Sequence, residues 1–152
     1  MTPDNLFSLS STLVLPAWLI LIFAPRRWPV LNAIPAYVVP LALSALYTVL
    51  VLRYFSEAGG GYGSLSEVRQ LFTSDMILVA GWVHYLAFDL FVGAWAAATM
   101  GRAGVSRVIQ GFILPVTFLF GPAGFLLALS VSGSNQALVS RRLKVRRKNP
   151  DL

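Results

Sequence analysis

Four apolar stretches, each at least 19 residues long, constrain this chain more than any other feature. They cover residues 6–24, 34–55, 76–100 and 108–131. At about 1.5 Å of rise per residue, a helix over any of them can cross the hydrocarbon core of a bilayer, which is about 30 Å thick. None shows the alternation of a barrel strand, and a helix satisfies its own backbone groups in lipid. We therefore predict an all-α integral membrane four-helix bundle.

Composition also favours a membrane protein. Of the 152 residues, 57% are hydrophobic and 12% are charged, whereas a soluble domain carries about 25% charged residues. The length favours one domain, which we place at residues 1–140, followed by a basic tail at residues 141–152. Because the chain has no cysteine, disulfides, thiolate metal sites and cysteine nucleophiles are excluded.

The third stretch carries the only histidine of the chain, His84, and an aspartate, Asp89, near its centre. An ionisable side chain at that depth costs about 2.5 to 3.5 kcal/mol on insertion scales, whereas an interhelical hydrogen bond contributes about 0.6 kcal/mol on average. Low dielectric favours the neutral forms, and a neutral carboxyl group can donate a proton while a neutral imidazole accepts one. Asp89 and His84 are therefore the candidate catalytic residues, with purely structural hydrogen bonding as the alternative.

Helix geometry separates these two side chains. Positions five apart on a helix point about 140° away from each other, so we expect each group to find its partner on another helix. Trp82 and Tyr85 lie on the same helical face as Asp89. They are candidates for substrate binding, and packing between helices is the alternative role. The candidate substrate-binding residues are Trp82, Tyr85, Tyr47 and Gln110.

Other kinds of site receive little support. One histidine supplies one nitrogen ligand, and no cluster of His, Asp and Glu has the spacing of a metal site. The glycine-rich run at residues 59–63 lacks the following Lys-Ser/Thr and the preceding strand of a phosphate loop. We therefore predict no metal and no cofactor. The basic run at residues 141–148 favours anionic lipid, at about 1 kcal/mol per charge, over nucleic acid.

Lysine and arginine counts predict the orientation in the membrane. Four crossings put both termini on one side, together with Arg53, Arg69 and the six basic residues of the tail. The opposite side receives Arg26, Arg27, Arg102 and Arg107. We therefore predict cytoplasmic termini in a bacterial inner membrane. The first stretch has no basic region before it, so we expect it to be retained rather than cleaved.

The longest loop, residues 57–75, predicts a short amphipathic helix in the headgroup plane. Ser64 and Glu67 have the spacing of a capping box, and apolar residues follow at helical spacing. Such a helix is either a connector or a lid over a site. The prolines inside the long stretches predict kinks; they are Pro16, Pro40, Pro115 and Pro122. The run at residues 121–124 is a candidate break in the fourth helix.

Residues 81–93, with the sequence GWVHYLAFDLFVG, resemble the signature of the abscisic-acid-deficient-4 family of small membrane proteins. Residues 16–28, 64–72 and 115–124 are also similar to that family. Together these stretches follow one another in order over nearly the whole chain.

The resemblance implies a four-span membrane protein. Plant members of the family are required to make neoxanthin from violaxanthin, a step that opens an epoxide and removes a neighbouring proton without redox change. An acid and a base suffice for this step, and Asp89 and His84 could supply them. The implied activity is a carotenoid or polyene isomerase with a lipophilic polyene as substrate. The alternative is a non-catalytic scaffold for a partner enzyme or pigment; a proton or ion pathway would require a homo-oligomer.

Overall fold

A computed structural model describes the backbone of residues 1–148 and the side chains of residues 1–141. Over this range the chain is all-α, without a strand. Its elements are α1 (Pro3–Phe23), α2 (Pro29–Ala33), the π-helical turn η1 (Ile34–Val38), α3 (Val39–Tyr54), the 3₁₀ turn η2 (Phe55–Glu57), α4 (Leu65–Leu71), α5 (Asp75–Arg102) and α6 (Arg107–Lys148). Four segments are long and apolar enough to cross a membrane: Pro3–Phe23, Pro29–Glu57, Asp75–Arg102 and Arg107–Arg141. The predicted fold class is confirmed.

The helices divide into two compact units. The first comprises residues 1–20 and 24–91, and the second comprises residues 21–23 together with the chain from residue 92 onward. The tail predicted at residues 141–152 begins inside α6, and its last four residues lie outside the described range. The candidate site lies in the first unit.

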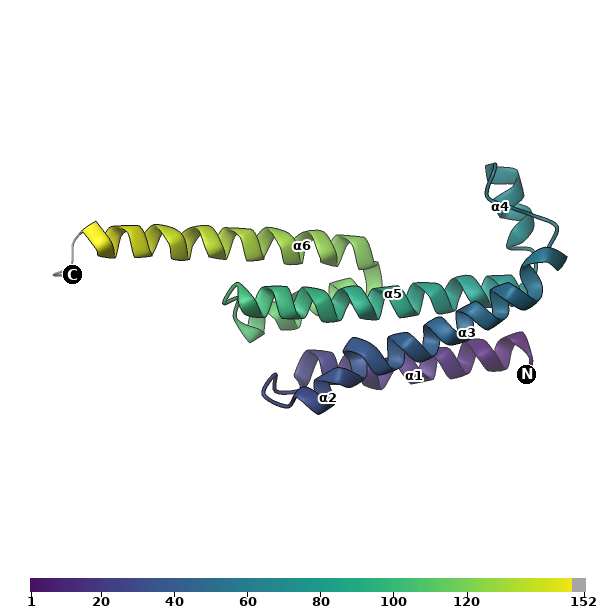
Figure 1. The fold of residues 1–152 in the computed structure, drawn as a ribbon, viewed down its shortest axis with the longest axis horizontal. Helices are drawn as coiled ribbons and strands as arrows, with labels where there is room; N and C mark the ends of the chain where they lie inside the picture. Colours follow the sequence, from purple (N-terminus) through teal and green to yellow (C-terminus); the bar gives the residue numbers. More distant parts are fainter. Residues whose placement is uncertain (149–152) are drawn as a thin grey trace. The chain divides into compact units, whose positions relative to one another are not determined.

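In the first unit, α5 packs against α1 on one face and against α3 on another. Trp82 of α5 donates from Nε1 to Ser11 Oγ of α1 at 2.9 Å, and its ring lies 5.2 Å from that of Phe7. On the α3 side, the ring centroids of His84 and Tyr47 are 5.2 Å apart. Figure 1 shows α1, α3 and the first part of α5 running lengthwise along one another.

A π-helical turn, η1, lies just before Pro40, whereas the predicted kink at Pro40 itself stays a prediction. Proline has no backbone N–H and its ring clashes with the preceding turn, and this part of the chain carries Pro35 and Pro40. The turn η1 contains Pro35, α3 begins directly after it with Pro40 as its second residue, and the segment remains helical to Glu57. Pro16, by contrast, lies inside α1, whose helical backbone continues past it.

The predicted loop helix is confirmed as α4. The Ser64 hydroxyl group accepts a hydrogen bond from the backbone N–H of Glu67 at 3.2 Å, as a capping box requires. The Glu67 carboxylate accepts from the backbone N–H of Gly63 at 2.9 Å, one residue before the cap. A Cβ atom on Gly60 would overlap the carbonyl oxygen of Glu67 and the backbone of Leu71. The glycine-rich run is therefore held closely against α4.

In the second unit, α6 is interrupted at Phe120, whose φ of −138° and ψ of 43° are not helical. The cause is Pro122, which lacks a backbone donor and clashes with the carbonyl group four residues before it. The helix therefore breaks at Phe120, one residue before the run at residues 121–124 that was the predicted break. At Pro115 the helical backbone continues.

The two halves of α6 lie against each other beyond this break. A Cβ atom on Gly124 would overlap the backbone of Thr117, and Asn135 Nδ2 donates to the carbonyl oxygen of Ala103 at 2.6 Å. Figure 1 shows the later part of α6 folded back on the earlier part. The prediction that both termini lie on one side of the membrane stays a prediction.

Candidate functional site

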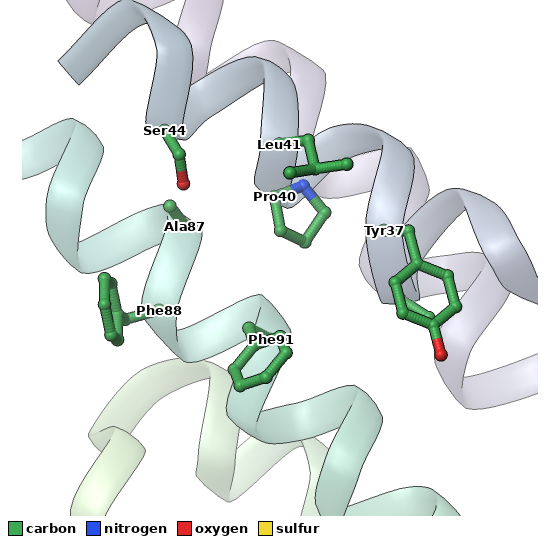
Figure 2. Close-up of a pocket in the computed structure, with 8 residues that line it drawn as sticks. Tyr37, Pro40, Leu41, Ser44, Ala87, Phe88 and Phe91 are labelled. Carbon is green, nitrogen blue, oxygen red and sulfur yellow. The ribbon is translucent and has the colours of Figure 1, made fainter. Parts of the chain in front are cut away.

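An apolar pocket of about 270 Å³ opens between α3 and α5. Its lining residues are Ala36, Tyr37, Pro40, Leu41 and Ser44 from η1 and α3, and Ala87, Phe88 and Phe91 from α5. Figure 2 shows the two helices on either side of the pocket, with Ser44 and Tyr37 toward its opposite ends. A mostly apolar wall with a few hydroxyl groups is typical of a site for a lipophilic molecule.

A second pocket, also about 270 Å³, lies farther along the same two helices. Its lining residues are Tyr47, Val51 and Phe55 from α3 and η2, Tyr62, Leu71 and Phe72 from the loop and α4, and Ile77, Ala80, Gly81 and His84 from α5. The loop and α4 therefore form one wall of this pocket. A lid and a plain connector both remain open as the role of α4.

The two pockets follow one another, and together we call them the α3–α5 groove. Along α3 the lining passes from Ser44 to Tyr47, about one turn on, and along α5 it passes back from Phe88 to His84. The lining from residue 37 to residue 55 spans about 27 Å of helix at 1.5 Å per residue. An extended lipophilic molecule fits these dimensions better than a compact one.

His84 lines the second pocket and contacts Phe88, which lines the first. Its ring stacks on that of Phe88 with centroids 4.6 Å apart and lies beside that of Tyr47 at 5.2 Å. Within the described part of the chain, no residue forms a hydrogen bond with the imidazole ring. The two rings position the side chain, and its nitrogen atoms remain available to a molecule in the groove.

Asp89 lines neither pocket of the groove. The hydroxyl group of Tyr85, one turn earlier on α5, lies within hydrogen-bonding reach of the Asp89 carboxyl group. The hydroxyl group beside Asp89 thus comes from the same helix, because residues four apart are neighbours on a helix surface. The Asp89 Oδ2 atom is buried and has no hydrogen-bond partner among the described residues. His84 and Asp89 are not brought together.

Trp82 and Gln110 form structural contacts outside the groove. Trp82 is anchored to α1 through Ser11. Gln110 belongs to the second unit, where Nε2 donates to the carbonyl oxygen of Val105 at 2.9 Å and Oε1 accepts from Arg107 at 3.2 Å. The substrate-binding roles of Trp82, Gln110 and Tyr85 stay predictions. Of the four candidate substrate-binding residues, Tyr47 is the one that lines the groove.

Sequence reasoning did not single out several lining residues, among them Tyr37, Tyr62 and Phe91. A signal existed for part of the set: Tyr37, Leu41 and Ser44 are spaced by four and three residues, which places them on one helical face. Tyr62 reaches the second pocket because of how the loop folds. No sequence spacing predicts this position.

The model of the ABA4-like family, described as ABA DEFICIENT 4-like, matches residues 5–127. The chain belongs to the ABA4-like family. The matched region includes every residue of the α3–α5 groove and the reversal at Phe120.

Among curated proteins, this ABA4-like chain is similar to Protein ABA DEFICIENT 4, chloroplastic, of Arabidopsis thaliana. The two are 26% identical over an alignment that covers 81% of this chain and 58% of the relative. The chain thus matches less than two thirds of the length of that relative. No solved structure matches it.

Proposed function

We propose that this ABA4-like protein is a membrane isomerase that opens an epoxide on a carotenoid or related polyene bound in the α3–α5 groove. The observation that carries the proposal is the position of His84, the only histidine of the chain, which lines the second apolar pocket and stacks on Phe88 of the first. The family resemblance supplies the substrate class. The length and apolar lining of the groove support an extended polyene.

The reaction removes one proton from carbon and delivers one to the epoxide oxygen. We assign the base to His84, whose neutral imidazole takes the proton next to the epoxide. The C–H electron pair forms the new double bond, the C–O bond breaks, and the oxygen takes a proton. We assign that proton to the Tyr47 hydroxyl group, whose ring adjoins His84. Proton return from imidazolium to phenolate restores the enzyme, so the conversion is an isomerisation that needs no oxidant.

Pigment analysis of a carotenoid-producing host tests the base. His84→Phe keeps a ring against Phe88 and removes both nitrogen atoms, so we expect product to fall by about 100-fold or more. Leu78→Ala is the matched control, because Leu78 is exposed on α5 and lines neither pocket. Undiminished product from His84→Phe at equal membrane protein level would contradict the isomerase proposal and favour the scaffold.

A second comparison separates the two candidate acids. Tyr47→Phe removes the hydroxyl group in the groove, and we expect a loss of about 100-fold or more. Asp89→Asn keeps the shape of a side chain that lies outside the groove, so we expect activity within about tenfold of the parent protein. The opposite result would return the acid role to Asp89, as predicted from the sequence.

The four apolar helices support a membrane location, and we propose the bacterial inner membrane as the particular one. Purified protein in nanodiscs containing a polyene epoxide tests whether the chain acts without a partner enzyme. Turnover by the purified chain, followed at several protein-to-disc ratios, distinguishes a monomer from a homo-oligomer.

A further inference from the structure

Serine and threonine hydroxyl groups inside the long apolar helices commonly donate to a carbonyl oxygen of their own helix. Among the described residues, five form this bond at distances between 2.7 and 3.0 Å. They are Ser10, Thr48, Thr117, Ser130 and Ser132. The bond satisfies the hydroxyl donor where hydrocarbon offers no acceptor.

Ser44 of α3 does not follow this pattern. Its carbonyl oxygen accepts from the Thr48 hydroxyl group at 2.8 Å, but its own hydroxyl group forms no hydrogen bond with any residue in the described part of the chain. Figure 2 shows the side chain directed from α3 toward Ala87 of α5, in the first pocket of the groove. The hydrogen-bonding capacity of this hydroxyl group is therefore available to a molecule in the pocket.

The surroundings of Ser44 offer no substitute partner. The α5 side of the pocket presents the methyl group of Ala87 and the rings of Phe88 and Phe91, and none of these side chains accepts a conventional hydrogen bond. The other hydroxyl group of the lining belongs to Tyr37, toward the opposite end of the pocket. A half-buried hydroxyl group left unpaired beside an apolar wall costs free energy. An oxygen atom of a bound molecule removes that cost.

The register of the two helices places Ser44 relative to His84. Ser44 lies three residues from Tyr47 on α3, Ala87 lies three residues from His84 on α5, and the rings of Tyr47 and His84 adjoin each other. Three residues correspond to about 4.5 Å of helical rise. The Ser44 hydroxyl group therefore lies about one turn along the groove from His84, on the side of the first pocket. One molecule lying along the groove can contact both side chains.

We propose that Ser44 determines the specificity of the groove by forming a hydrogen bond with a hydroxyl group of the polyene, about one helical turn from the carbon atom that His84 deprotonates. The inference rests on the proposed function for the identity of that carbon atom. A polyene epoxide with a hydroxyl group at this distance pairs with Ser44, whereas one without it leaves Ser44 unpaired. A site that pairs with a hydroxyl group discriminates against the analogue that lacks it.

Binding of two polyenes tests the inference without requiring turnover. The probes are the epoxide of zeaxanthin, which carries a hydroxyl group on each terminal ring, and the epoxide of β-carotene, which carries none. Each probe is equilibrated with the immobilised protein in detergent, and the retained pigment is measured by absorbance. We expect the ratio of the two affinities, hydroxylated over unsubstituted, to fall by about tenfold in Ser44→Ala, the effect of one neutral hydrogen bond.

Two further variants control this measurement. Ser44→Thr keeps a hydroxyl group and should keep the ratio of affinities found in the parent protein. Ser8→Ala removes an exposed hydroxyl group on α1, outside both pockets, and should also leave the ratio unchanged. An unchanged ratio in Ser44→Ala, or the failure of both probes to bind the parent protein, would overturn the inference.

Turnover separates a failure of this inference from a failure of the proposed function. In Ser44→Ala we expect the KM for the hydroxylated probe to rise by about tenfold and kcat to stay within about twofold, because the bond is the same in the ground state and the transition state. A Ser44-dependent ratio of affinities without turnover of either probe would refute the isomerase and support the role of Ser44. Turnover of both probes with equal kcat/KM would support the isomerase and overturn the role of Ser44.

Discussion

At the scale of single residues, His84 and Asp89 differ in what holds them. His84 is positioned by the rings of Phe88 and Tyr47 beside an apolar groove, whereas Asp89 is half-buried with an unpartnered Oδ2 atom. Helix geometry predicts that the two side chains point apart. It does not predict which neighbouring helix each face meets, because this depends on how α1 and α3 pack on α5.

Asp89→Leu tests the energetic role of the carboxyl group. An unpaired buried polar atom costs about 1–3 kcal/mol, so we expect the free energy of unfolding in detergent to stay equal or to rise by up to that amount. Asp4→Leu, at the exposed first turn of α1, should lower it by less than about 1 kcal/mol. A loss above about 2 kcal/mol for Asp89→Leu would show that the carboxyl group holds the fold together.

The bond between Trp82 and Ser11 gives a second prediction. Trp82→Phe keeps a ring beside Phe7 and removes the Nε1 donor, so it should lower the free energy of unfolding by about 1 kcal/mol. Ser11→Ala should have a similar effect, and the double variant should cost little more than either change alone. Fully additive losses would mean that the two helices are not coupled through this bond.

At the scale of elements, capping and proline signals predicted two local features, the start of α4 and the break in α6. The sequence did not predict the reversal, because a proline inside a membrane helix ordinarily produces a kink. The reversal also needs Gly124, whose missing side chain lets the second half lie against Thr117. This requirement is visible only in three dimensions.

A pair of glycine substitutions tests that requirement. Gly124→Ala adds a Cβ atom that overlaps Thr117, so we expect a loss of about 1–3 kcal/mol in the free energy of unfolding from overpacking. Gly111→Ala adds its Cβ atom in open space and should gain up to about 1 kcal/mol from helix propensity. Equal effects of the two changes, measured by thermal unfolding in detergent, would be incompatible with close packing of the two halves of α6.

The link between Glu67 and the glycine-rich run should control the wall of the second pocket. Glu67→Ala removes the acceptor of the Gly63 N–H group, at a cost of about 1 kcal/mol, which corresponds to roughly a fivefold rise in local opening. We expect limited proteolysis within residues 59–63 to become faster by that factor. Glu57→Ala, which removes an exposed ion pair with Arg53, serves as the control and should leave cleavage unchanged.

At the scale of the whole molecule, length and hydropathy were sufficient to predict an all-α chain with four long apolar helices. Those properties report what each segment can do in lipid and not how segments contact each other. The division into two units, which passes through α1 and α5, and the shape of the α3–α5 groove therefore had no sequence signal. The orientation predicted from charge counts stays a prediction, because no contact between helices tests it.

Blocking the groove tests whether it is the place of reaction. Leu41→Trp adds bulk at an exposed lining position and should reduce product formation by about tenfold or more, equivalent to a loss of about 1.4 kcal/mol in binding. Val49→Trp, exposed on α3 outside both pockets, should have no such effect. Equal activity of the two variants at matched expression would place the reaction elsewhere in the chain.

The exposed rings on the wall of the groove also determine how a substrate reaches it. Phe88 and Phe91 are 55% and 51% exposed, so we expect a polyene substrate of the proposed reaction to reach this wall by lateral diffusion within the bilayer. The rate should then saturate with the mole fraction of substrate in the lipid. Adding empty vesicle lipid at constant total substrate should slow turnover by dilution in two dimensions, although the aqueous volume is unchanged.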